Sequence, residues 1–264
     1  MQKILIFTDL DGSLLHRDTF KFEEIKEYIK KLLSKGISII PNTSKTEKEI
    51  LEFNNELGSS LPYISENGSA INGLNLLNSS LPKELILSKE KNNLIKIFEN
   101  SVPISLQNKC KWLSEMDRKK QIMIFGLEDQ KLEMALDRKY TIPFIFDGNK
   151  TEKKELFKIV KKIGLVLQEG GRVINLTDKV NKAKALQVFV RFFKKNYKDV
   201  KTIAVGDNYN DLDMLKISDF PCLVFNDKFT LDEIPIKNLI ITNKPSPEGW
   251  ADVIKTALVK INKS

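Results

Sequence analysis

The strongest constraint on this chain is an apolar run that ends abruptly on two carboxylates. Residues 3–8 read KILIFT, and Asp9, Leu10, Asp11 and Gly12 follow them. A short run of this kind, with β-branched residues, predicts a buried strand of a parallel sheet. We expect Asp9 and Asp11 to point to one side of that strand, where their like charges would raise at least one pKa. A bound Mg²⁺ would relieve this repulsion, since it favours oxygen ligands and commonly bridges carboxylates and a phosphate.

The residue after the second aspartate favours a ligand site at this strand end. Gly12 permits a tight turn and a close approach of the backbone to a phosphate group. One aspartate could then attack phosphorus while the other transfers a proton. The alternative is an ordinary turn, because Asp-Gly is a common turn dipeptide.

A second acidic cluster follows another predicted strand. Residues 202–205 form a buried apolar run, and Asp207, Asn210 and Asp211 lie in the loop between this run and a helix. These side chains can complete the oxygen shell of a cation or orient its waters. Two acidic clusters at two strand ends are harder to explain as turns than either one alone. We therefore expect a metal-dependent phosphoryl site.

A strand, a helix and a second strand open the chain. Apolar residues at helical spacing predict a helix over 22–33, Gly36 occupies a C-cap position, and residues 37–40 predict the second strand. This unit implies a parallel sheet, whose ligands bind outside the carboxyl ends of the strands.

Hydroxyl groups and a lysine follow this second strand. Thr43 and Ser44 could hold phosphate oxygens together with the amides of the next helix N-terminus, and Lys45 adds a point charge. The alternative is a capping box, in which Thr43 or Ser44 pairs with Glu47. Both interpretations can hold, since a helix N-terminus is itself an anion site.

A tight turn is predicted farther along the chain. Residues 62–71 suggest a strand that runs into Glu66, Asn67 and Gly68. Asn-Gly favours a hairpin turn, so these residues have a structural role by themselves. A substrate-facing role for Glu66 and Asn67 is a second hypothesis.

The sequence pattern in the middle of the chain differs from the pattern at both ends. We predict an α/β fold with a Rossmann-like parallel-sheet core, formed by residues 1–80 and 178–264, and an inserted α+β cap over 81–177 that sets substrate specificity. Arg172 follows a glycine turn near the end of this cap and could bind a carboxylate or phosphate as a bidentate fork. Within the cap, helices are expected at 90–100, 128–137 and 152–163, and strands at 122–125, at 144–146 and on both sides of the glycine turn within 165–176.

Composition narrows the functional classes. The net charge of +8 could attract nucleic acid, but the lysines occur in scattered pairs among carboxylates, as on solvated helix faces. Cys110 and Cys222 lie far apart, which favours a reduced cytoplasmic protein. No apolar run approaches the roughly 18 residues of a membrane span, and no signal peptide is expected. A triad that depends on histidine is disfavoured, because His16 is the only histidine.

Together these segments resemble the haloacid dehalogenase superfamily of phosphohydrolases. The first motif matches residues 9–13, the second Thr43 and Ser44, the third Lys182, and the fourth residues 206–211. Finer features resemble the mannosyl-3-phosphoglycerate phosphatase family: TSKT at 43–46, ENG at 66–68, GGR at 170–172 and PSPEGW at 245–250. The sequence departs from the pattern of that family at two positions: Ala183 replaces the usual glycine, and Ser13 replaces the usual threonine. Both replacements are small.

The resemblance implies roles for these residues. Asp9 would be the nucleophile that forms an aspartyl-phosphate, and Asp11 would protonate the leaving group and then activate water. Mg²⁺ would be held by Asp9, the backbone carbonyl of Asp11 and Asp207. Asp211 and Asn210 would support the metal site. Thr43 and Lys182 would hold the phosphoryl group. The sugar and glycerate ends of the substrate would be recognised by Arg172, Lys45, Glu66, Asn67 and Gly68.

The implied activity is release of phosphate from mannosyl- or glucosyl-3-phosphoglycerate, which yields a glycosylglycerate compatible solute. One alternative is a broader sugar-phosphate or sucrose-phosphate phosphatase, or a related phosphomutase. Another is a nucleic-acid-binding protein on a degenerate enzyme scaffold, which would need a continuous basic face with stacking aromatic residues. We expect a small phosphorylated substrate, no nucleic-acid or membrane partner, and a monomer or weak homodimer.

Overall fold

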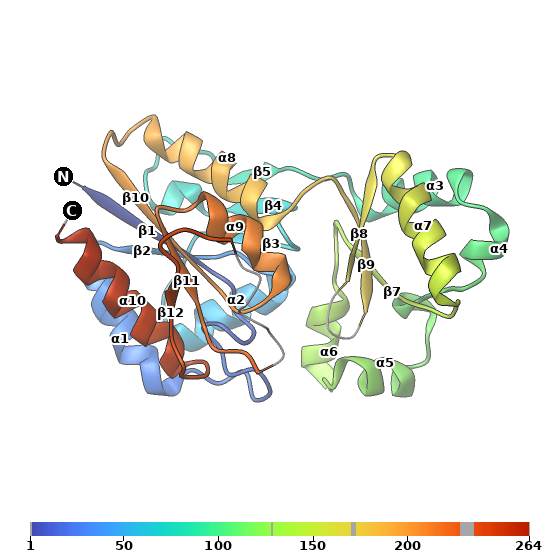
Figure 1. The fold of residues 1–264 in the computed structure, drawn as a ribbon, viewed down its shortest axis with the longest axis horizontal. Coiled ribbons are helices and arrows are strands. Elements are labelled where there is room, and N and C mark those ends of the chain that lie inside the picture. Colours follow the sequence, from blue (N-terminus) through green and yellow to red (C-terminus); the bar gives the residue numbers. More distant parts are fainter. Residues whose placement is uncertain (1, 128, 170–172, 228–234, 264) are drawn as a thin grey trace. The chain divides into compact units, whose positions relative to one another are not determined.

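The structure is a computed structural model that describes residues 2–127, 129–169, 173–227 and 235–263 (Figure 1). The chain divides into two compact units. Unit 1 comprises residues 1–44, 53–85 and 181–264, and unit 2 comprises residues 45–52 and 86–180. The borders expected from the sequence lay at 80/81 and 177/178, and no pattern in the sequence assigned residues 45–52 to the inserted segment.

A five-stranded parallel sheet forms the centre of unit 1, in the order β12-β11-β10-β1-β2. This arrangement confirms the predicted α/β fold. The central pair is in register from Lys3 opposite Val200 to Thr8 opposite Val205, so β1 and β10 end side by side. The strands are β1 Lys3–Thr8, β2 Ser38–Pro41, β10 Val200–Gly206, β11 Phe220–Leu223 and β12 Ile240–Ile241.

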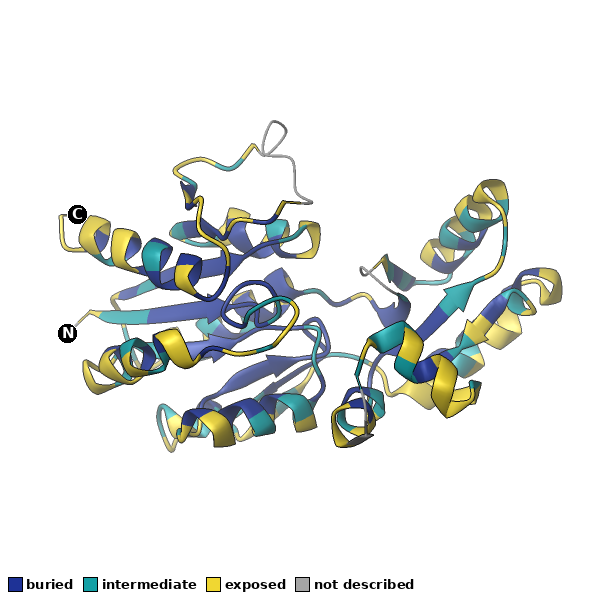
Figure 2. Cartoon of the chain, turned by 90° about the horizontal axis from the view of Figure 1, so that it is seen from below, coloured by how far each residue is buried: buried dark blue, intermediate teal, exposed yellow. Residues whose placement is uncertain are grey.

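Helices cover the sheet of unit 1, and Figure 2 shows the buried strands between helices whose outer faces are exposed. α1 buries Ile25, Ile29 and Leu32, which share one helical face, and its first turn carries two glutamates. On α10, Trp250 is fully buried and its Nε1 donates to Thr8 Oγ1 over 2.9 Å. The helices are α1 Glu23–Ser34, α2 Glu47–Leu57, α8 Lys182–Lys194, α9 Leu212–Ile217 and α10 Glu248–Ile261.

The predicted hairpin is present in unit 1. β3 (Tyr63–Ser65) pairs antiparallel with β4 (Ala70–Asn72), and the short β5 (Glu84–Ile86) follows β4 in the same sheet. The loop between β3 and β4 has three consecutive residues with positive φ: Glu66 at 46°, Asn67 at 58° and Gly68 at 95°. Asn and Gly tolerate this left-handed region better than other residues, which explains why the turn forms here.

Unit 2 is built on a four-stranded antiparallel sheet in the order β6-β7-β9-β8. α3 and α7 pack on one face of it through apolar side chains such as Phe98 and Leu156, which are fully buried with Phe144 and Leu176 of the sheet (Figure 1). The strands are β6 Cys110–Trp112, β7 Ile142–Phe146, β8 Leu165–Glu169 and β9 Ile174–Asp178. The helices are α3 Lys91–Ser101, α4 Ile104–Gln107, α5 Arg118–Phe125, α6 Asp129–Leu136 and α7 Lys150–Lys162.

One predicted strand is wrong. Residues 122–125 were expected to be extended, but they form the second half of α5. The ends of this helix decide its conformation: the Asp117 side chain accepts from the backbone N of Lys120, and Gly126 closes the helix at φ 65°. A short apolar run does not distinguish strand from helix, and Met123 within it is 77% exposed.

The predicted cap of α2 is also displaced. Thr46, not Thr43 or Ser44, begins the capping box, because Thr46 N donates to Glu49 Oε2 over 2.9 Å and Glu49 N to Thr46 Oγ1 over 3.3 Å. Thr43 and Ser44 are therefore left outside the helix. None of the helices in the described part of the chain combines the length and hydropathy that crossing a membrane requires.

Candidate active site

The loop after β1 carries the first two aspartates. β1 ends at Thr8, so the prediction that Asp9 and Asp11 share one face of an extended strand is wrong. The chain turns at this point, with Leu15 N donating to Leu10 O over 2.8 Å, and the side chain of Leu10 is fully buried. This backbone hydrogen bond and the burial of Leu10 favour the turn over the strand. The Asp9 side chain is buried, since the residue is only 6% exposed. Asp11 forms a backbone bridge with Leu15.

Three of the predicted carboxylates converge in unit 1. Asp9, Asp207 and Asp211 are buried and each has an oxygen within 4.8 Å of the others, the arrangement found when the described residues are searched for metal-binding groups. They come together because β1 and β10 are adjacent parallel strands that end at the same level. Three carboxylate oxygens suit a hard dication such as Mg²⁺. The side chain of Asp11 is outside this group, which we call the acidic cluster.

Lys182 supplies positive charge to the acidic cluster from the first residue of α8. Its Nζ lies 2.9 Å from Asp9 Oδ1 and 2.7 Å from Asp211 Oδ1, and the side chain is 2% exposed. Burial by itself would lower the pKa of Lys182, but the carboxylates of Asp211 and Asp9 raise it, so the pKa lies above its usual value. The Asn181 side chain fixes the start of the helix, since it accepts from Lys184 N over 2.8 Å.

Asp207 has three donors that we did not predict. Ser13 Oγ donates to Oδ1 over 3.1 Å, Asn226 Nδ2 to Oδ2 over 3.1 Å, and Arg17 Nη2 to Oδ2 over 2.5 Å. Ser13 was noted only as part of a motif, and nothing in the local sequence marked Arg17 or Asn226. Burial raises the pKa of Asp207, and the neighbouring charges of Asp211 and Asp9 add to this shift.

Asp211 is held on both carboxylate oxygens. Oδ1 faces Lys182, while Oδ2 accepts from the backbone N of Asp207 and of Asn208, each over 3.1 Å. Burial raises its pKa, whereas Lys182 lowers it and Asp9 raises it further. Asp211 thus organises the loop after β10. Asn210, which was predicted to support the site, is exposed in the same turn.

Two glycines allow the loops to approach each other. Gly12 has φ 80°, and a Cβ there would lie 2.7 Å from Asp207 Oδ2. A Cβ on Gly206 would lie 2.3 Å from the Cβ of Asp211, which no real side chain tolerates. Any larger residue at either position would separate the carboxylates.

The second predicted strand end and the hairpin reach the start of α8. Thr43 is fully buried, and its carbonyl accepts from Asn67 N over 2.8 Å. Asn42 Nδ2 donates to Lys182 O over 3.0 Å, and a Cβ on Gly68 would lie 2.3 Å from the Asn181 carbonyl. Thr43, Asn67 and Gly68 therefore border the segment that carries Lys182. Glu66 is 2% exposed and Ser44 is partly buried.

The remaining predicted residues lie elsewhere. Lys45 belongs to unit 2, where its Nζ is 3.1 Å from Glu49 Oε1. Burial of Glu49 would raise its pKa, but Lys45 and Arg138 bring the pKa below its ordinary value. Arg172 and the adjacent glycines at 170–171 are outside the described residues.

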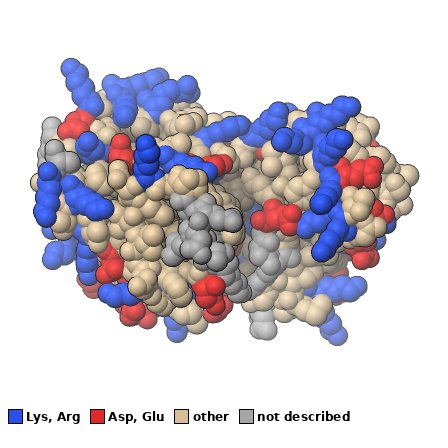
Figure 3. Space-filling view, in the orientation of Figure 1, with Lys and Arg blue, Asp and Glu red and all other residues tan. Residues whose placement is uncertain are grey.

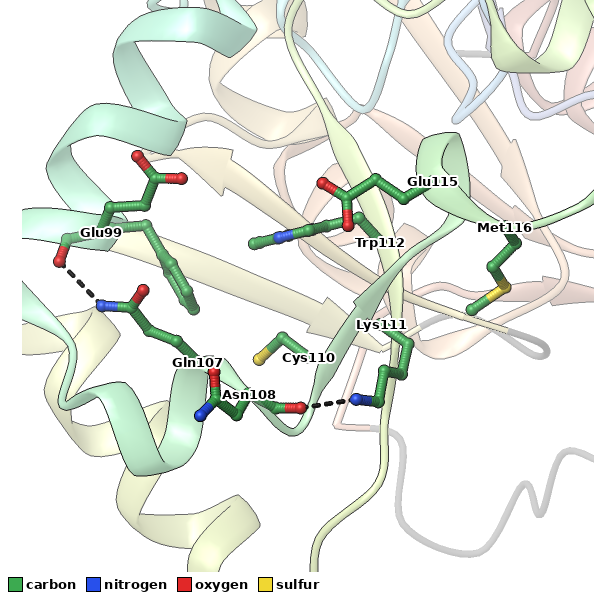
Figure 4. Close-up of a pocket in the computed structure, with 9 residues that line it drawn as sticks. Glu99, Gln107, Asn108, Cys110, Lys111, Trp112, Glu115 and Met116 are labelled. Atoms are coloured by element: carbon green, nitrogen blue, oxygen red, sulfur yellow. Dashed lines mark hydrogen bonds between the residues drawn. The ribbon is translucent and has the colours of Figure 1, made fainter.

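A cavity of about 380 Å³ lies beside β6 in unit 2 and contains none of these residues (Figure 4). Gln107 Nε2 donates to Glu99 O over 2.8 Å, and Lys111 Nζ to Asn108 O over 2.7 Å. Burial raises the pKa of Cys110, another lining residue, to about 12, so it is not a ready nucleophile. We assign no chemistry to this cavity.

Residues 6–252 match a model of the haloacid dehalogenase-like hydrolase family. The chain belongs to this family. A glucosyl-3-phosphoglycerate/mannosyl-3-phosphoglycerate phosphatase of Persephonella marina is 30% identical over 98% of this chain and 99% of its own length. A mannosyl-3-phosphoglycerate phosphatase of Pyrococcus horikoshii is 28% identical over 81% of this chain and 88% of its own. The resemblance drawn from the motifs is confirmed, as is the prediction of a phosphoric monoester hydrolase.

A solved structure supports the fold independently. A haloacid dehalogenase-like hydrolase from Bacteroides thetaiotaomicron superposes with a TM-score of 0.67 at 16% sequence identity, covering 98% of this chain and all of the other. At that identity the likeness concerns the fold alone.

Proposed function

We propose that the protein is a Mg²⁺-dependent phosphatase that releases inorganic phosphate from mannosyl-3-phosphoglycerate or glucosyl-3-phosphoglycerate. The product is the glycosylglycerate, a compatible solute. The names of the relatives support this substrate class. The observation that carries the proposed chemistry is the buried acidic cluster with Lys182 between Asp9 and Asp211.

Asp9 is the proposed nucleophile, and the distribution of contacts favours it over its neighbours. Asp211 and Asp207 both have donors on each carboxylate oxygen. Among the described residues, Asp9 has a cationic partner on Oδ1 and accepts no hydrogen bond on Oδ2. Lys182 holds the orientation of Asp9 through Oδ1, which leaves Oδ2 for attack on phosphorus and formation of an aspartyl-phosphate.

The acidic cluster is the proposed Mg²⁺ site, with Asp9, Asp207 and the backbone carbonyl of Asp11 as ligands. A bound Mg²⁺ would neutralise carboxylate charge and polarise the phosphoryl oxygens. Lys182 and Thr43 would stabilise the charge on the transferring group, which is the main requirement of phosphoryl transfer. Asp11 would donate a proton to the leaving alkoxide and later accept one from water.

On the face of the molecule that Figure 3 shows, basic side chains lie over both units. On the face that Figure 3 shows, lysines and arginines lie among acidic side chains. A general positive field of this kind favours the arrival of an anionic substrate. It offers little support for the alternative of nucleic-acid binding, which relies on a continuous basic track.

The test is phosphate release from mannosyl- and glucosyl-3-phosphoglycerate, with sucrose 6-phosphate beside them, in Mg²⁺ and in chelator. We expect turnover of at least one glycosyl phosphoglycerate in Mg²⁺ alone. Asp9→Asn should reduce kcat by at least about 1,000-fold, because the nucleophile is lost. Asp18→Asn is the matched control, since Asp18 is exposed in the same loop and should be dispensable.

Three results would each contradict a part of the proposal. Full activity of Asp9→Asn would rule out the assigned nucleophile. Equal turnover in chelator would rule out the metal, and a preference for sucrose 6-phosphate would assign the enzyme to the broader group of sugar phosphatases.

A further inference from the structure

Arg17 lies beside the acidic cluster, and the proposed function gives it no role. Its loop, residues 16–21, is closed by its own backbone, because His16 N donates to Lys21 O and Phe20 N donates to His16 O, each over 2.9 Å. From this loop the Arg17 side chain contacts Asp207, which is 190 positions away along the chain. The closed loop therefore presents a cation to a carboxylate of the site.

The contact with Asp207 uses only part of the guanidinium. Nη2 of Arg17 lies 2.5 Å from Oδ2 of Asp207, and the side chain makes no other hydrogen bond to the described residues. A guanidinium has several N–H donors, so most of them are left for another acceptor. The side chain of Arg17 is 33% exposed, whereas that of Asp207 is 3% exposed. Arg17 thus has a buried partner on one side and solvent on another.

The guanidinium also approaches the glycine of the first motif. A Cβ on Gly12 would lie 3.1 Å from Arg17 Nη2 and 2.7 Å from Asp207 Oδ2. The bare backbone of Gly12, the guanidinium and the carboxylate of Asp207 therefore meet at one point. Backbone without a side chain allows the close approach of a phosphate group.

Among the described residues, two cations contact the acidic cluster, and they differ in how firmly they are held. Lys182 is 2% exposed and pairs with both Asp9 and Asp211. Moving it would leave two buried carboxylates without a cation, which is strongly unfavourable. Arg17 pairs with Asp207 alone and is partly exposed. Arg17 is therefore the cation that can change its partner.

A dication at the acidic cluster would change the balance of charge around Arg17. In its absence, each of Asp9, Asp207 and Asp211 has a cationic contact. With Mg²⁺ on Asp9 and Asp207, the guanidinium would face further positive charge at close range and would be repelled. A phosphate dianion relieves this repulsion because it binds both cations at once. The planar fork of arginine also matches two oxygens of a phosphate group.

We propose that Arg17 exchanges Asp207 for the phosphate group of the substrate when Mg²⁺ occupies the acidic cluster, an inference that rests on the proposed function. In the metal-free site, Arg17 competes with the metal for Asp207. In the loaded site, the same guanidinium holds the phosphate. Arg17 therefore couples the binding of the metal to the binding of the phosphate group.

The test is the affinity for inorganic phosphate, the proposed product, measured by isothermal titration calorimetry on the full-length protein. In saturating Mg²⁺, Arg17→Gln should bind phosphate about 10- to 100-fold more weakly than the wild type, because charge-assisted hydrogen bonds are lost. In chelator, the two proteins should differ by less than about twofold, since Arg17 of the wild type stays on Asp207.

The affinity for Mg²⁺ provides a second measurement with the opposite sign. Without phosphate, Arg17→Gln should bind Mg²⁺ more tightly than the wild type, since the guanidinium no longer competes for Asp207. A merely structural role of Arg17 would weaken the binding of both ligands, because a distorted site holds neither well. Opposite changes in the two affinities are therefore specific to the proposed exchange.

Two further variants complete the test. Arg17→Lys keeps the positive charge but loses the fork, so in Mg²⁺ it should bind phosphate about threefold more weakly than the wild type. It carries the test if Arg17→Gln does not fold. Lys21→Gln removes an exposed charge from the same loop and should match the wild type in both titrations.

The outcomes separate this inference from the proposed function. If the wild-type protein hydrolyses no glycosyl phosphoglycerate and binds no phosphate in Mg²⁺, the proposed function fails and the inference fails with it. If the wild type is active and the folded Arg17 variants bind phosphate in Mg²⁺ as tightly as it does, only the inference is overturned. An equal loss of phosphate affinity in Mg²⁺ and in chelator would also overturn it, because the effect would then be independent of the metal.

Discussion

The acidic cluster of unit 1 and a polar patch of unit 2, formed by Gln168, Asn175 and Thr177, use buried polar groups in opposite ways. In the acidic cluster, Asp207 and Asp211 have donors on both oxygens, and Lys182 is paired with two carboxylates. In the polar patch, neutral oxygens of Asn175 and Thr177 make no hydrogen bond to the described residues. Charges must be compensated before any ligand arrives, because an isolated buried charge is far more costly than a buried amide or hydroxyl. Neutral oxygens can therefore stay buried without a partner where carboxylates cannot.

The largest effect should come from removing the cation of the acidic cluster. Lys182→Met leaves the carboxylates of Asp9 and Asp211 without their buried partner, so the free energy of unfolding in chelator should fall by about 3–5 kcal/mol at pH 7. Chemical denaturation measures this change. Lys184→Met, on an exposed position of the same helix, is the control and should change stability by less than about 0.5 kcal/mol.

Part of that loss should be recovered by a metal. Saturating Mg²⁺ should raise the melting temperature of Lys182→Met, because the dication replaces the missing positive charge. A variant as stable as the wild-type protein in chelator would show that the carboxylates do not depend on Lys182.

The pH dependence of the acidic cluster should be the next largest effect. In the folded protein the pKa of Asp207 is raised to about 7, chiefly by burial. Its unfolded pKa is about 3.9, so between these values the folded state binds more protons and this carboxyl makes stability fall as the pH rises. Asp207→Asn removes the titrating group. In chelator, the stability of this variant relative to the wild type should therefore increase from pH 4 to pH 7, by on the order of 2 kcal/mol.

The measurement is urea denaturation of both proteins across that pH range. Asp213→Asn, an exposed aspartate of α9, serves as the control and should show a difference that is constant with pH. A constant difference for Asp207→Asn as well would mean that this carboxyl is not perturbed by its surroundings.

A smaller effect is expected at Arg17, which lies at the edge of the acidic cluster. Arg17→Gln removes a positive charge that contacts Asp207 Oδ2, and the Mg²⁺ affinity should rise about three- to tenfold because repulsion between two cations is removed. Isothermal titration calorimetry gives the affinity directly. Lys21→Gln, an exposed charge in the same loop, should leave it unchanged. A weaker affinity in Arg17→Gln would indicate that the guanidinium orders the site instead of competing with the metal.

Local sequence patterns were sufficient for much of the fold. The apolar run of residues 3–8, the helix near 22–33 and the Asn-Gly turn carry short-range signals, and the structure has a strand, a helix and a hairpin at these places. The strand predicted at 122–125 was wrong, because an apolar run of this length fits either a strand or a helix. Only the caps at Asp117 and Gly126 favour the helix. The cap of α2 lies two or three residues after the predicted position, since several hydroxyl residues compete for one position.

The sequence by itself determined which charged residues are available and that acidic groups follow two strands. The tertiary structure alone decided that Asp9, Asp207 and Asp211 converge, because the register of β1 against β10 sets the level at which both strands end. It also decided that Arg17 contacts Asp207 and that Asn175 and Thr177 share one face with Gln168. Local patterns report on a residue and its near neighbours along the chain, whereas these contacts join residues that only folding brings together.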